Sequence, residues 1–106
     1  MIYTQLSKNY KYEVIAEAIY GRELEHFHYD FDRLNYERLL GGLPDGEYKT
    51  DVEKRLADTL MQMAKVEAIY TALMSQVDDQ DAYAAAVITT TKKREEAKNE
   101  VRPSAK

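Results

Sequence analysis

Two carboxylates and one histidine are spaced as the ligands of a metal site would be. Glu23 and His26 form a Glu-x-x-His pair, which places a carboxylate and an imidazole one helical turn apart on one face. If the chain reverses near Pro44, antiparallel pairing places Glu67 opposite Glu23. Two chains meeting at this level would supply the ligands of a carboxylate-bridged di-metal site, which binds dioxygen or oxidises ferrous iron.

This metal site is the alternative interpretation, because its pattern has little specificity. Glu25 and His28 show the same spacing in a chain with 19 acidic residues. The Glu-x-x-His pair also precedes the single Glu67, the reverse of the order in ferritin-like proteins. We predict instead that Glu23, Asp30 and Glu67 pair with basic or tyrosine side chains across a helical bundle. The available basic residues are Arg22, Arg33, Arg38, Arg55 and Lys65.

Other catalytic chemistries lack their usual signatures. The chain has no cysteine, which excludes thiolate nucleophiles, thiolate metal sites and disulfides. Its serines have no glycine-rich elbow around them, and Gly41 and Gly42 are expected to end a helix instead of cradling a phosphate. We therefore predict that the protein is not an enzyme and has no cofactor.

Length and charge limit the remaining classes. A chain of 106 residues is expected to form a single domain, and its net charge is -4. No stretch approaches the ~20 apolar residues of a membrane span, and no signal peptide is evident, so we expect a cytoplasmic protein. Residues 92–106 are basic, but we expect a solvated helix end there and not a nucleic-acid or membrane site.

The pattern of breaks predicts an all-α protein, a long antiparallel helical hairpin with a shorter third helix. Residues 41–46 are rich in glycine with one proline and predict a turn. Thr50 and Glu53 have the spacing of a capping box, and residues 78–81 form a polar break with good N-cap candidates. The predicted ranges are an N-terminal arm 1–8, helices 9–40, 51–77 and 80–101, and a tail 102–106.

Apolar spacing predicts the packing faces of the first two helices. In the second helix, apolar positions alternate spacings of 4 and 3, which is a heptad seam. These positions are Val52, Leu56, Thr59, Met63, Val66, Tyr70, Leu73 and Val77, and Leu60 and Met74 widen the face. In the first helix, a turn of about 100° per residue gathers the apolar side chains on one buried arc. That arc holds Tyr12, Ile15, Ala16, Ile19, Tyr20, Leu24, Phe27, Phe31 and Leu34.

Several apolar residues fall outside these faces and predict self-association. The candidate contact residues are Tyr29, Tyr36, Met61 and Ile69. A second apolar surface on a helical hairpin favours a homo-oligomer, a dimer or larger. We therefore predict a small non-enzymatic interaction or assembly protein that acts through self-association and a protein partner. In a competing arrangement, the third helix covers this surface within one chain and forms a three-helix bundle.

Overall fold

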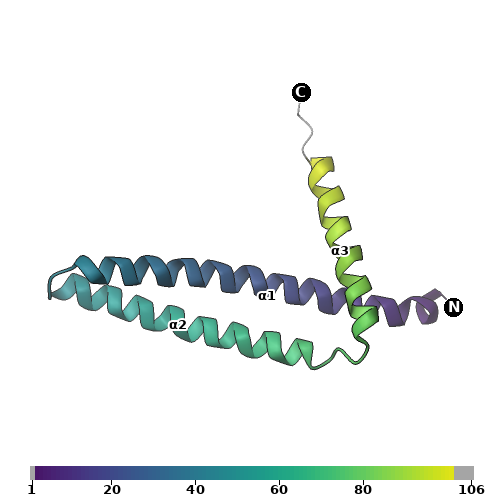
Figure 1. Ribbon diagram of the computed structural model, residues 1–106, viewed down its shortest axis with the longest axis horizontal. Helices are drawn as coiled ribbons and strands as arrows, with labels where there is room; N and C mark the ends of the chain where they lie inside the picture. The colour runs from purple at the N-terminus through teal and green to yellow at the C-terminus, as the bar shows by residue number, and fades with distance from the viewer. Residues whose placement is uncertain (1, 102–106) are drawn as a thin grey trace. The chain divides into compact units, whose positions relative to one another are not determined.

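The computed structural model describes the backbone of residues 2–101 and the side chains of residues 10–99. Within this range it is all-α, as predicted, with three helices and no strand. The helices are α1 (Ile2–Gly42), α2 (Glu47–Met74) and α3 (Gln80–Val101). α1 and α2 pack along each other as a hairpin, and α3 contacts α1 (Figure 1).

The helix bounds differ from the predicted ranges most at the start of the chain. α1 begins at Ile2, so helix covers the residues 2–8 that were expected to form an arm. No glycine or proline precedes Gly21, and the β-branched residues near the start disfavour helix only weakly. α3 spans the predicted range 80–101, whereas the predicted tail 102–106 lies outside the described residues.

The turn between α1 and α2 is shorter than the capping box predicted, because α2 begins before Thr50. α2 begins at Glu47 because the Thr50 amide already donates to the Gly46 carbonyl, at 3.0 Å. The Thr50 hydroxyl also donates to that carbonyl, at 3.1 Å, so the prediction that Thr50 caps the helix is wrong. Gly46 precedes the helix with φ of 153°, a conformation that other residues rarely adopt.

Asp79 caps the start of α3, as the polar break predicted. The Ala82 amide donates to the Asp79 carboxylate at 3.0 Å, and the Tyr83 amide donates to the Asp79 carbonyl at 3.0 Å. A carboxylate at this position satisfies an amide that has no partner within the helix and also favours the positive end of the helix dipole.

The contacts gather into two compact units, where the sequence predicts one domain. The first unit joins residues 1–20 to residues 73–106, and the second contains residues 21–72. The hairpin interface of α1 and α2 therefore lies mainly in the second unit, whereas α3 packs in the first. Each unit has its own set of buried residues.

The first unit has a small apolar core between the beginning of α1 and α3. Its buried members are Tyr12, Ile15, Ala16, Ile19 and Ala86. The four from α1 belong to the predicted buried arc, and this part of the arc is confirmed.

Two ion pairs at the rim of this core link α3 to α1. Lys93 contacts Glu13 at 3.0 Å, and Arg94 contacts Glu17 at 2.9 Å. The Arg94 guanidinium also lies 3.6 Å from the centre of the Tyr20 ring. The basic segment that was expected to be only solvated therefore has acidic partners at these two positions.

In the second unit, the heptad seam predicted for α2 is buried against α1. Val52, Thr59, Met63 and Val66 are buried, which confirms four of the eight predicted positions. The prediction is wrong at Tyr70, which is 36% exposed, and at Val77, which lies beyond the end of α2 at Met74. Leu60, expected to widen this face, is instead 47% exposed. The contact between the two helices is thus a narrow two-stranded seam and not the broad face of a larger bundle.

The predicted buried arc of α1 is wrong in this unit. Six half-buried side chains of α1 here repeat at spacings of 4 and 3, as the α2 seam does. These six are Arg22, His26, Tyr29, Arg33, Tyr36 and Leu40, and Asp30 and Asn35 are half-buried beside them. The arc was drawn to include Leu24, Phe27, Phe31 and Leu34 because they are apolar, but all four are exposed, so the arc misses the buried face after Gly21.

Candidate interaction surface

Because the predicted buried arc of α1 is wrong after Gly21, a row of apolar side chains on α1 is exposed. Leu24, Phe27, Phe31 and Leu34 are spaced by 3, 4 and 3 residues, and we call them the α1 stripe. They are 45%, 67%, 58% and 45% exposed. In heptad terms they occupy the positions farthest from the α2 seam. A contiguous exposed apolar row of this kind is typical of a protein interaction site.

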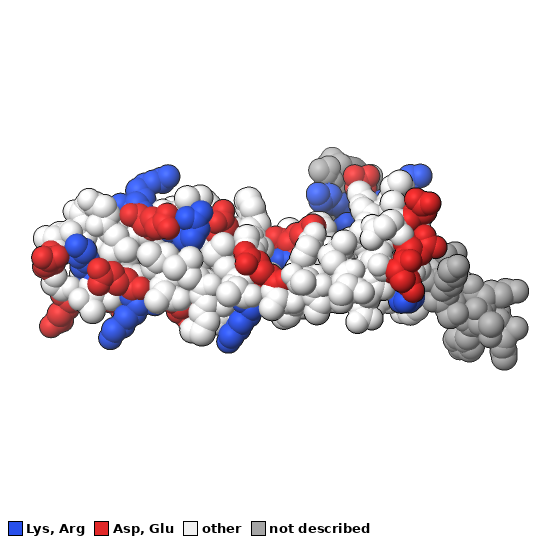
Figure 2. Space-filling model, turned by 60° about the horizontal axis from the view of Figure 1, so that its bottom comes forward, with Lys and Arg blue, Asp and Glu red and all other residues white. Residues whose placement is uncertain are grey.

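Charged residues flank the α1 stripe without interrupting it. Arg38 follows Leu34 by four residues and continues the same spacing, whereas Glu23 precedes Leu24. Both are exposed, and neither forms a hydrogen bond or ion pair within the part of the chain that the structure describes. The space-filling view shows wide uncharged areas between scattered charged side chains (Figure 2). The stripe therefore has an acidic end and a basic end.

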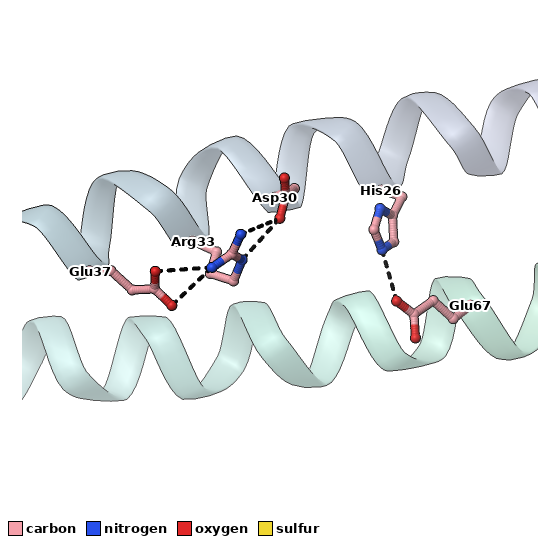
Figure 3. Close-up of polar contacts among 5 residues, drawn as sticks. All are labelled: His26, Asp30, Arg33, Glu37 and Glu67. Carbon is pink, nitrogen blue, oxygen red and sulfur yellow. Dashed lines mark hydrogen bonds and ion pairs between the residues drawn. The ribbon is translucent and has the colours of Figure 1, made fainter.

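On the side facing α2, α1 carries a network of charges instead of an apolar stripe. Arg33 contacts Asp30 at 2.8 Å and Glu37 at 3.0 Å, with all three on successive turns of α1 (Figure 3). The Arg33 guanidinium donates hydrogen bonds to Asp30 and Glu37, and these bonds raise its pKa. The prediction that Asp30 pairs across the bundle is wrong, because its partner Arg33 lies one turn away on the same helix. Among the three carboxylates predicted to pair across the bundle, only Glu67 contacts the other helix, through His26, and Glu23 has no partner among the described residues. These charges satisfy one another, so the polar side of α1 can face its partner helix.

Polar contacts cross from α1 to α2 at Tyr36, which hydrogen-bonds Arg55, and at His26. His26 Nε2 donates to Glu67 Oε2 at 2.9 Å, and Figure 3 shows the two side chains pointing toward each other. Both groups are partly exposed, so water weakens the attraction between them. The contact confirms that the chain reverses near Pro44 and that residues 26 and 67 share one level of the hairpin.

A shallow cavity of about 370 Å³ opens beside this contact. Its lining consists of Arg22, Glu23, His26, Val66, Glu67 and Tyr70. The three residues proposed as metal ligands therefore line one cavity. Within the described residues of a single chain, no three His, Asp or Glu side chains form a group that could hold a metal ion. Metal binding at this level would need ligands from a second chain.

The four predicted interface residues occupy two different environments. Tyr29 and Tyr36 are half-buried on the side of α1 that faces α2, and Tyr36 hydrogen-bonds Arg55. Met61 and Ile69, on α2, are 51% and 45% exposed. Sequence reasoning missed the α1 stripe because it assigned those residues to the core. Extending the 3.5-residue period of α2 to α1 would have found them.

Comparison with protein families, curated proteins and solved structures finds no match to this chain. None of the helices, over the residues described, is long and apolar enough to cross a membrane. The features that bear on function are the exposed α1 stripe, the charges at its ends and the cavity.

Proposed function

We propose that this protein is a small non-enzymatic helical assembly protein that acts by self-association and by holding a protein partner. The observation that carries the proposal is the α1 stripe, four large apolar side chains on the side of α1 away from α2. Beyond Gly21, the helix faces α2 largely with polar and aromatic side chains and leaves the four stripe residues exposed to water. Burying those residues against another chain removes their apolar surface from water, which favours association.

A second candidate function rests on the His26–Glu67 contact and on Glu23 at the same cavity. In this alternative, two chains bring their carboxylates and histidines together and hold a pair of iron or manganese ions. The metal would then be part of the interface between the chains. The observation that favours the alternative is the placement of Glu23, His26 and Glu67 around one cavity.

Native mass spectrometry tests both candidates on protein from growth supplemented with iron and manganese. The assembly proposal expects a dimer or larger species whose mass is unchanged after treatment with a chelator. A monomer at all concentrations would contradict it. The metal alternative expects bound metal that the Glu67→Ala variant loses, and equal metal content in that variant would contradict it. Asp58→Ala, which removes an exposed α2 carboxylate outside the cavity, is the matched control.

A further inference from the structure

We infer that the partner on the α1 stripe is a second copy of this chain, packed antiparallel about a two-fold axis near Tyr29. This inference rests on the proposed function, which requires self-association but does not specify its geometry. The supporting observation is the pair of opposite charges at the two ends of the stripe, Glu23 and Arg38, which have no partner among the described residues.

The direction of packing follows from these charges. In a parallel pair, Glu23 would lie beside Glu23 of the second copy, and Arg38 beside Arg38. Like charges at both ends would oppose association. In an antiparallel pair, the acidic end of each stripe meets the basic end of the other. Charge complementarity therefore selects the antiparallel arrangement.

The register follows from the spacing within the stripe. An axis at its midpoint places Phe27 of one copy against Phe31 of the other, and Leu24 against Leu34. Both pairs are then apolar, and all four stripe residues of each copy are covered. This pairing is isologous, because each copy uses the same surface, and so it closes at two copies.

In this register Arg38 of one copy reaches Glu23 of the other. Glu23 of one copy lies opposite residue 35 of the other copy. Arg38 of that other copy is three residues farther along its helix, or about 4.5 Å along the axis. Long helical side chains point toward the N-terminus of their own helix, and this direction brings the Arg38 guanidinium toward Glu23 of the second copy. Each dimer gains two such pairs at the rims of the two cavities, since Glu23 lines the cavity.

Two single charge reversals test the pairing. Glu23→Arg and Arg38→Glu each replace both attractive pairs of the homodimer with like-charged pairs. Each variant alone is expected to dimerise roughly 3- to 30-fold more weakly than the parent chain, from the usual strength of exposed ion pairs. Mixing the two variants creates a heterodimer in which both pairs are again opposite in charge. The mixture is therefore expected to recover the dimerisation of the parent chain.

The outcomes separate this inference from the proposed function. Sedimentation equilibrium measures the dissociation constants of the parent, each variant and the equimolar mixture, and circular dichroism checks that every variant stays helical. Asp58→Arg makes the same change in charge as Glu23→Arg, but at an exposed α2 position, and is expected to leave dimerisation unchanged. A dimeric parent whose variants do not complement each other would overturn the antiparallel pairing alone. A monomeric parent would overturn the self-association proposal as well.

Discussion

Truncating Phe27 to alanine is expected to weaken self-association strongly while leaving the hairpin folded. Phe27 is 67% exposed, and its ring contacts the neighbouring His28 ring edge-on, with 6.2 Å between centres. Full burial of a phenylalanine side chain contributes about 1.5–3 kcal/mol, so covering the exposed two-thirds contributes about 1–2 kcal/mol per copy. A two-fold dimer loses this contribution twice, about 2–4 kcal/mol, which corresponds to a roughly 30- to 700-fold higher dissociation constant.

Sedimentation equilibrium over a concentration series measures this change, and thermal unfolding followed by circular dichroism measures the helical fold. Helix content of the Phe27→Ala monomer should match that of the parent, because alanine favours helix more than phenylalanine does. Tyr48→Ala is the matched control, an aromatic residue that is 62% exposed but lies outside the α1 stripe. An unchanged dissociation constant for Phe27→Ala, or an equal loss for Tyr48→Ala, would refute the assignment of the interface to this stripe.

Two further predictions concern the two compact units. The hydrogen bond from Tyr12 to Asp78, followed by burial, raises the pKa of Tyr12 to about 12. Because this folded-state pKa exceeds the ordinary value of about 10, its stabilisation is complete below pH 10 and is lost as pH rises toward 12. Urea unfolding of Tyr12→Phe should show less loss of stability across that interval than the parent, and an identical loss would contradict this. In the hairpin, Met63→Ala should lower the free energy of unfolding by about 2–5 kcal/mol, since Met63 is buried in the α2 seam. Met61→Ala, at a 51% exposed position, should cost far less, and equal effects in chemical denaturation would contradict the seam.

The fold was predictable where one local pattern is sufficient to determine it. The 3.5-residue spacing of α2 identified the four buried residues of its seam, because this spacing keeps them on one side of the helix. Asp79 was predictable as a cap, because its side chain acts on amides only three residues away. The approach of His26 to Glu67 followed from the position of the turn and the antiparallel pairing alone.

The buried face of α1 was not predictable from its apolar residues. Hydrophobicity placed Phe27 and Phe31 in the core, whereas the hairpin buries the polar side around Arg33. The residues of α1 that face α2 follow the same 3.5-residue spacing as the α2 seam. Arg33 can lie on that side because Asp30 and Glu37 pair with its charge. The candidate interface therefore differs from the predicted one. Tyr36 is half-buried in the hairpin, whereas the residues of the α1 stripe are exposed.

The measurement that tests the central claim most directly is the molecular mass of the parent chain in solution across a wide concentration range. Sedimentation equilibrium is expected to give a reversible transition from the 12.3 kDa chain to a species of twice that mass. Addition of a chelator should leave the transition unchanged. A mass of 12.3 kDa at every concentration would contradict self-association through the α1 stripe.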